Sequence, residues 1–187
     1  MPGSELDKDI GLWEFTLIHY GSEGVQPAVI ALQDKHGADV NLLFFCCWMA
    51  ATERGRLSKS QIAETDTCVE HWRKEVTRPL RRVRDTIKGV QQLADLEGAM
   101  DVRAKVLAAE VESERIAQNA MESIARKWHR LGERDRFADA VANLATYVQW
   151  LGADSDREDT GSLNALIHAV FPESDLSDLD WNIAVDE

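Results

Sequence analysis

The apolar run at residues 42–51 constrains this chain most, because it is the longest such run and holds no polar residue. It directly follows the polar segment 33–41, in which Gly37 is placed to end one helix and Asp39 to cap the next. A helix that is apolar all the way round is normally buried on most of its sides. We therefore expect Val40–Ala51 to form the central helix of the core.

The rest of the sequence favours helices. Only four prolines and eleven glycines interrupt 187 residues, and almost no segment alternates apolar and polar residues as a half-buried strand does. Apolar steps of three and four, with end signals, predict helices near residues 10–20, 24–36, 61–76, 80–96, 99–131, 137–151 and 163–170. The sequence thus predicts an all-α protein, a single bundle of about six to eight helices around the central helix.

Three local signals refine these helices. Ser58 and Gln61 have the spacing of a capping box. Pro79 predicts a break or kink near Arg78, since the residue before a proline is pushed out of the helical region. The segment 99–131 contains no helix breaker, so it predicts one long helix or two helices joined near residues 112–114.

Charge is spread unevenly along the chain, whose formal net charge is −12. Residues 10–152 are expected to form the helical domain, and residues 153–187 an acidic linker, a short helix and a flexible tail. Residues 173–187 hold six acids and no base, and we call them the acidic tail. Residues 73–88, which we call the basic belt, lie in a segment (72–89) of seven bases and two acids. Because a net-acidic chain repels nucleic acid, any polyanion binding would depend on the belt alone.

Several features indicate the cytoplasm. Three cysteines, two of them adjacent, cannot form a disulfide framework and suggest a reducing compartment. The N-terminal residues carry neither the basic nor the apolar region of a signal peptide. The apolar run at 42–51 is about half as long as a bilayer requires. We expect a cytoplasmic protein without a membrane segment.

Three stretches are distinctive: LWEFTLIHYG, ALQDKHGADVNLLFFCCWMA and WRKEVTRPLRRVR. Together, and above all through the motif Leu-Gln-Asp-x-His-Gly-x-Asp-Val-Asn-Leu-Leu, they resemble a family of small uncharacterised proteobacterial proteins, a domain of unknown function. The resemblance covers residues 12–131 and extends at most to residue 152. It implies no assigned activity, and the tail lies outside it.

The corner at residues 33–41 is the first candidate site. Its polar residues are Gln33, Asp34, His36, Asp39 and Asn41. The acids and the histidine could be metal ligands or an acid/base pair. Equally, Gly37 and Asp39 cap helices, and His36 or Asn41 can bind carbonyls at the helix ends. We favour the capping role. The run supplies too few ligands for a metal, so no metal or other cofactor is expected.

The belt and the tail are candidate binding surfaces for a protein partner. The candidate residues are Arg73, Arg78, Arg81, Arg82, Arg84 and Lys88 in the belt, and Leu176, Leu179 and Trp181 in the tail. The belt is expected to be a solvated face, or one that holds the chain's own acidic tail, rather than a nucleic-acid site. The tail resembles either an interaction segment or a terminal helix docked on the bundle.

No phosphate-binding loop, nucleophile elbow or zinc pattern occurs in the sequence. The leading hypothesis is a non-enzymatic cytoplasmic protein that acts as an interaction or regulatory module. One alternative is a helical bundle that binds a small ligand, or is an enzyme, with its site at the corner. The other alternative is nucleic-acid binding through the belt. The sequence does not indicate an oligomeric state.

Overall fold

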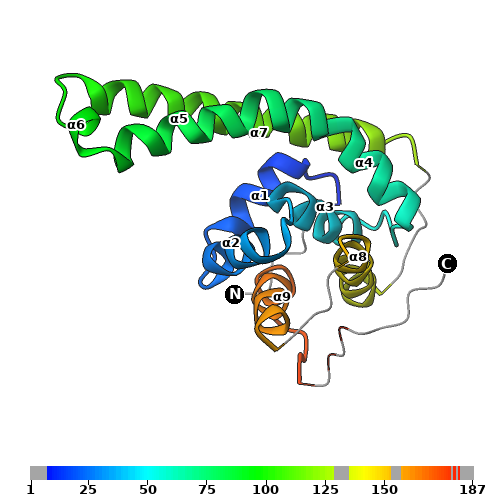
Figure 1. Cartoon of the computed structure of the whole chain (residues 1–187). Coiled ribbons are helices and arrows are strands. Elements are labelled where there is room, and N and C mark those ends of the chain that lie inside the picture. Colours follow the sequence, from blue (N-terminus) through cyan, green and yellow to red (C-terminus); the bar gives the residue numbers. More distant parts are fainter. Residues whose placement is uncertain (1–7, 129–134, 153–156, 178, 180, 182–187) are drawn as a thin grey trace.

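A computed structural model describes residues 8–128, 135–152, 157–177, 179 and 181 (Figure 1). These residues form helices and no strand, so the all-α prediction is confirmed. Apart from the four-residue α6, each α-helix has nine residues or more. In chain order the elements are α1 (Leu12–Tyr20), α2 (Val25–His36), α3 (Val40–Ala51), α4 (Lys59–Trp72), a π-helical segment (Arg73–Thr77), α5 (Arg78–Gly89), α6 (Gln91–Ala94), α7 (Ala99–Ala125), α8 (Arg136–Trp150) and α9 (Arg157–Val170).

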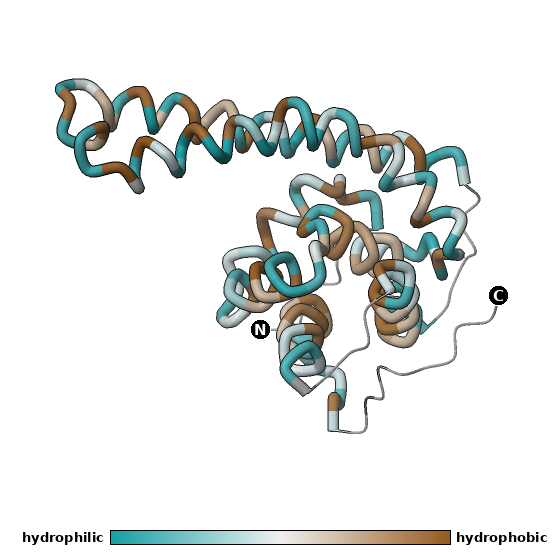
Figure 2. The backbone as a smooth tube through the Cα atoms, in the orientation of Figure 1, coloured by the Kyte–Doolittle hydropathy of each residue, from teal (hydrophilic) through white to brown (hydrophobic). Residues whose placement is uncertain are grey.

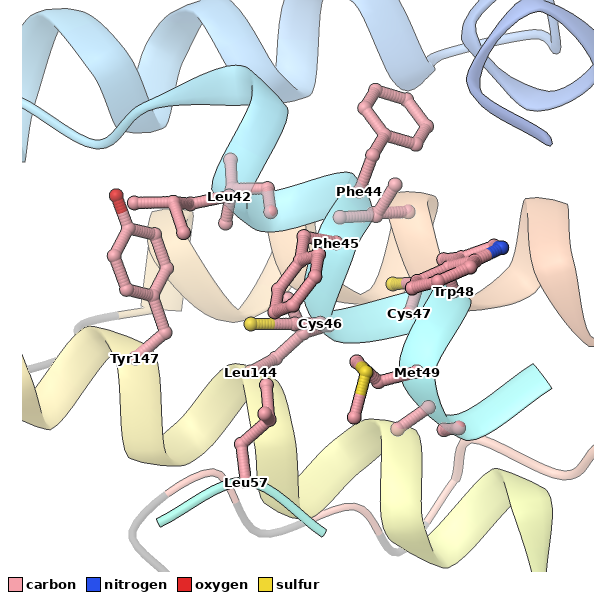
Figure 3. Close-up of a cluster of buried hydrophobic side chains, with 14 of the residues drawn as sticks. Leu42, Phe44, Phe45, Cys46, Cys47, Trp48, Met49, Leu57, Leu144 and Tyr147 are labelled. Atoms are coloured by element: carbon pink, nitrogen blue, oxygen red, sulfur yellow. The ribbon is translucent and has the colours of Figure 1, made fainter. Parts of the chain in front are cut away.

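Helix α3 is the centre of the core, as predicted. Every residue from 42 to 51 is at most 2% exposed. Helices α1, α2, α7, α8 and α9 all contact α3. Leu144 and Tyr147 of α8 point toward α3, beside Cys46 and Leu42 (Figure 3). An all-apolar helix is stable here because each of its sides packs against another helix.

Helix α9 belongs to the same core. The short helix expected at residues 163–170 begins earlier, at Arg157, and packs along α2. Its Leu163, Leu166 and Ile167 are fully buried. Helix α9 therefore shares one core with the residues 10–152 that the sequence assigns to the helical domain.

The N-terminus of α1 is capped by a residue distant in sequence. Gly11 supplies no side chain there, and the N–H of Leu12 donates instead to Oε2 of Glu122 at 2.9 Å. Trp48 Nε1 donates to the carbonyl of Ile10 at 2.9 Å. Helix α1 is thus fixed by both α7 and α3.

His19, near the end of α1, makes the stability depend on pH. Its Nδ1 lies 3.0 Å from the carbonyl oxygen of Ala169, and its buried Nε2 has no hydrogen-bond partner among the described residues. Burial lowers the pKa of His19 below its usual 6.5, although the contact with Ala169 opposes this effect. The unfolded chain therefore binds this proton more readily than the folded chain. Stabilisation present above pH 6.5 is lost as the pH falls through the lower, folded-state pKa.

We expect urea unfolding between pH 8 and pH 5 to show this loss, and to show less of it in the variant His19→Gln. His71 is exposed, so His71→Gln is the matched control and should keep the wild-type dependence on pH. Equal pH dependence in His19→Gln and the wild type would contradict the role of His19.

The predicted capping box of α4 is confirmed, and of the break or kink predicted near Arg78 the structure shows an interruption of the α-helical geometry without a break. Ser58 Oγ accepts from the N–H of Gln61, and Gln61 Oε1 accepts from the N–H of Ser58. Instead of breaking near Arg78, the chain passes from α4 through the π-helical segment directly into α5. Pro79 lies in the first turn of α5. It has no N–H for the carbonyl four residues earlier, and the wider π turn before it accommodates this without ending the helix.

Helices α5 and α7 lie side by side as a hairpin that projects beyond the core, with α6 at its tip (Figure 1). We call residues 78–116 the arm. No residue of α5 is buried. Figure 2 shows hydrophobic segments at intervals along both helices of the arm. No helix among the described residues is long and apolar enough to cross a membrane.

Candidate functional site

The corner at residues 33–41 is the turn between α2 and α3, and its helix caps are as predicted. Gly37 ends α2 with φ of 71°, a conformation that favours glycine, and its N–H donates to the carbonyl of Gln33. Asp39 caps α3, where its Oδ1 accepts from the N–H of Asn41 at 2.8 Å. The backbone N–H of Asp39 donates to the Tyr147 hydroxyl at 2.7 Å.

Four of the five corner residues, Gln33, Asp34, Asp39 and Asn41, line one hollow, which is described below, and His36 is not among its lining residues. His36 Nε2 lies 2.9 Å from Oδ1 of the buried Asp159, on α9. Asp39 lies against α4 and the π-helical segment, as described below, and Asp34 is exposed. Within the described ranges, no three His, Cys, Asp or Glu side chains are placed to hold a metal ion. Of the five, Gln33 and Asn41 also line a larger groove, so they connect the corner to it.

Arg73 connects the belt to the corner. Its Nη1 lies 2.6 Å from Oδ2 of Asp39 and 2.8 Å from Oδ1 of Asp66. Burial alone would lower the pKa of the Arg73 guanidinium, but the two carboxylates raise it above its usual range. The π-helical segment begins at this residue. The role of Arg73 within the described residues is therefore an internal ion pair between α4, the corner and the start of the arm.

Arg81 and Arg84 also face carboxylates. Arg81 Nε donates to Glu110 Oε1 at 2.8 Å, and its Nη2 donates to Glu114 Oε1 at 2.6 Å. Arg84 Nη1 lies 3.3 Å from Glu110 Oε2. These contacts join α5 to α7 along the arm. The expectation that Arg78, Arg81, Arg82, Arg84 and Lys88 share one exposed side is therefore wrong for Arg81 and Arg84, which are partly buried, whereas Arg78, Arg82 and Lys88 are exposed.

The corner and the belt meet at a groove between the arm and helices α1 and α2. The groove has a volume of about 440 Å³. Its walls carry apolar and aromatic side chains, and its inner end carries amides and ion pairs. The lining residues are Trp13, Thr16, Leu17, Tyr20, Gln26, Ile30, Gln33, Val40, Asn41, Arg81, Arg84, Leu107, Glu110, Val111, Glu114 and Gln118. A mostly apolar hollow of this size with a few convergent polar groups is typical of a binding site.

A second hollow of about 270 Å³ adjoins the groove at the corner. Both are lined by Gln33, Val40, Asn41, Arg81 and Glu114. At this junction Arg81 Nη1 lies 3.5 Å from Oε1 of Gln33, at the limit of a hydrogen bond. Burial raises the pKa of the Glu114 carboxyl above its usual value, and Arg81 only partly opposes this. The inner end of the groove thus holds a cation beside a carboxyl group that protonates more readily than usual.

The sequence does not indicate several residues that shape this groove. Gln118 of α7 donates from Nε2 to Asn41 Oδ1 at 2.7 Å and accepts at Oε1 from Thr16 at 3.1 Å. Glu110 is 3% exposed, although neither a motif nor an apolar period marks it. One signal in the sequence could have indicated these ion pairs. The predicted helix 99–131 has an acidic cluster at residues 110–114, and the predicted helix before it, 80–96, has a cluster of arginines.

The three tail residues lie on the core rather than on the belt. Trp181 is 4% exposed, and its Nε1 donates to Asn164 Oδ1 of α9 at 2.8 Å. Leu176 and Leu179 are half-buried against the core. Of the tail acids, Glu173 and Asp175 are exposed, and Asp178, Asp180, Asp186 and Glu187 lie outside the described residues. Partner binding through the tail stays a prediction, as does the expected lack of nucleic-acid binding.

Comparison with known proteins agrees with the resemblance seen in the sequence. DUF2390, a family of proteins of unknown function, matches residues 11–121. The chain belongs to the DUF2390 family. The DUF2390 region runs from the start of α1 into α7 and includes the corner, the belt and all the groove-lining residues. No curated protein and no solved structure matches the chain.

Proposed function

We propose that this DUF2390 protein is a non-enzymatic interaction module of the cytoplasm that binds an apolar segment of a partner protein in the groove. The observation that carries the proposal is a pair of exposed apolar walls. Leu17 and Ile30 on one wall, and Leu107 and Val111 on the other, each expose more than a third of their surface. Exposed apolar patches rimmed by polar residues mark binding surfaces.

The polar groups of the groove support a peptide as the occupant. Gln26, Gln33 and Asn41 supply amide side chains, which both donate and accept hydrogen bonds. The backbone of a bound segment presents the same two kinds of group, and each must be paired once it is removed from water. Apolar side chains of the segment would contact the walls, while its backbone would bind the amides.

The test compares two neighbouring residues of α1. Leu17 lines the groove, whereas Ile18 is exposed but does not line it. Leu17→Asp should weaken capture of the partner from a cell extract by about tenfold or more, because a carboxylate facing an apolar segment loses its hydration. Ile18→Asp should capture the partner as the wild type does. Equal capture by both variants, or no protein captured by the wild type, would contradict the proposal.

A small ligand is the second candidate function, favoured by the volume of about 440 Å³ and by the Glu114 carboxyl beside Arg81. If the groove holds a small molecule or a substrate, native mass spectrometry of the purified protein should show an added mass that Leu17→Asp removes and Ile18→Asp keeps. Such a mass, together with the absence of a captured protein, would favour the ligand or enzyme over the peptide.

A further inference from the structure

The inner end of the groove holds more carboxylates than cations. Two sets of ion pairs meet there, and we call their members the charged cluster. The cations are Arg73, Arg81 and Arg84, and the acids are Asp39, Asp66, Glu110 and Glu114. Three cations face four acids, so the cluster has a formal charge of −1 after every internal pair is counted. The exposed Arg78 and Asp34, which line the adjoining hollow, cancel each other.

Glu110 shows that the cluster also lacks a hydrogen-bond donor. It lines the groove and is 3% exposed. Its Oε1 accepts from Arg81, whereas its buried Oε2 accepts from no described residue. Arg84 Nη1 lies 3.3 Å from Oε2 without a hydrogen bond, and Arg84 Nε donates to the exposed Asp85 instead. A buried carboxylate oxygen without a donor is unfavourable, so an added donor would stabilise the cluster.

Glu114 is the carboxylate of this pair of acids that a ligand can reach. Its side chain is 28% exposed, compared with 5% for Glu110. It lines both the groove and the hollow. Burial raises the pKa of the Glu114 carboxyl, and the nearby carboxylates of Glu110 and Asp39 raise it further against the effect of Arg81. A second cation beside Glu114 would relieve this repulsion.

We propose that the segment bound in the groove carries a lysine or arginine whose cation pairs with Glu114. This inference rests on the proposed peptide-binding function and adds the chemistry of the segment. The ammonium or guanidinium group balances the charge of the cluster and supplies the missing donors. A metal ion is a poorer occupant, because within the described ranges no three acidic, histidine or cysteine side chains are placed to hold one.

The wall of the groove on α7 suits such a segment. Leu107, Val111 and Glu114 all line the groove and are spaced four and three residues apart, so they follow one another on one side of the helix. Apolar residues of the segment would contact the two apolar side chains, and its basic residue would follow at Glu114. Trp13 and Tyr20 also line the groove. Aromatic faces attract cations, and the aliphatic stems of lysine and arginine pack on apolar surfaces.

The test selects peptides on the full chain from a random library of nine-residue peptides displayed on phage. The selected peptides should combine apolar residues with lysine or arginine. They should bind Leu17→Asp at least about tenfold more weakly than the wild type, which places them in the groove.

A double-mutant cycle then isolates the cation. Norleucine in place of the basic residue keeps an aliphatic side chain without the charge, and should weaken binding to the wild type by about tenfold or more. On Glu114→Gln the same replacement should change binding by less than about twofold, because the partner carboxylate is absent. Glu112→Gln is the matched control, since Glu112 is an exposed acid of the same helix outside the groove, and it should respond as the wild type does.

Circular dichroism checks the fold of Glu114→Gln, and the difference between the two peptides on the wild type is measured without any variant. Peptides that depend on Leu17 but contain no basic residue would overturn this inference and leave the groove proposal standing. An equal effect of norleucine on the wild type and on Glu114→Gln would also overturn it. If no selected peptide depends on Leu17, both proposals are wrong.

Discussion

Replacing Asp39 by alanine is expected to lower the free energy of unfolding by about 2–4 kcal/mol, one of the two largest effects that we predict. The loss of the helix cap contributes about 1 kcal/mol of this, because the N–H of Asn41 loses its acceptor. The rest comes from Arg73, whose side chain is only 19% exposed and would keep a single carboxylate partner, Asp66. Urea unfolding at neutral pH measures the change.

Asp39→Asn is the matched control. The amide oxygen of asparagine can still accept from the N–H of Asn41, so the cap is kept, whereas the NH2 group in place of Oδ2 cannot accept from Arg73, so that the ion pair and its hydrogen bond are lost. Asp39→Asn should therefore lose clearly less stability than Asp39→Ala. A loss of about 1 kcal/mol or less in Asp39→Ala would mean that Asp39 acts as a cap alone.

Asn143→Ala should lower the free energy of unfolding by about 3–4 kcal/mol. Asn143 is fully buried, and its Oδ1 accepts from the N–H of Leu57 at 2.7 Å. Its Nδ2 donates to the carbonyls of Cys46 and Gly55, both at 3.1 Å. Alanine would leave the N–H of Leu57 buried without a partner and would open a cavity beside α3. Thermal and urea unfolding both report this loss.

Asn119→Ala provides the comparison, since Asn119 is an exposed residue of α7. Its replacement should change the free energy of unfolding by about 0.5 kcal/mol or less. If Asn143→Ala cost no more than Asn119→Ala, the three hydrogen bonds of Asn143 would contribute nothing net to the fold.

Local patterns were enough to predict much of this structure. The buried α3, the caps at Gly37 and Asp39 and the box at Ser58 and Gln61 all depend on residues within a few positions of each other. The physical causes act over the same short range, namely the unpaired groups at helix ends and the period of the helix.

Residues with distant partners could not be predicted in this way. In the sequence, Arg73 cannot be told apart from the other cations of the belt. Nothing near it indicates that Asp39, 34 residues earlier, pairs with it. Asn143 lies inside a regular apolar pattern. That pattern does not indicate that its side chain accepts a hydrogen bond from the backbone N–H of Leu57. In α7, no neighbouring residue indicates that Glu110 is buried, because its partners Arg81 and Arg84 belong to another helix.

The π-helical segment at the base of the arm has a consequence for how chains of this kind can change in length. A π turn takes up one residue more than an α turn, so α5 is rotated by about 100° relative to an uninterrupted α-helix. A deletion of one residue within Arg73–Thr77 could therefore restore an ordinary α-helix and leave Arg81 and Val83 on their present sides. The same deletion early in α5 would turn the remainder of that helix by about 100° and misplace its residues in the groove wall.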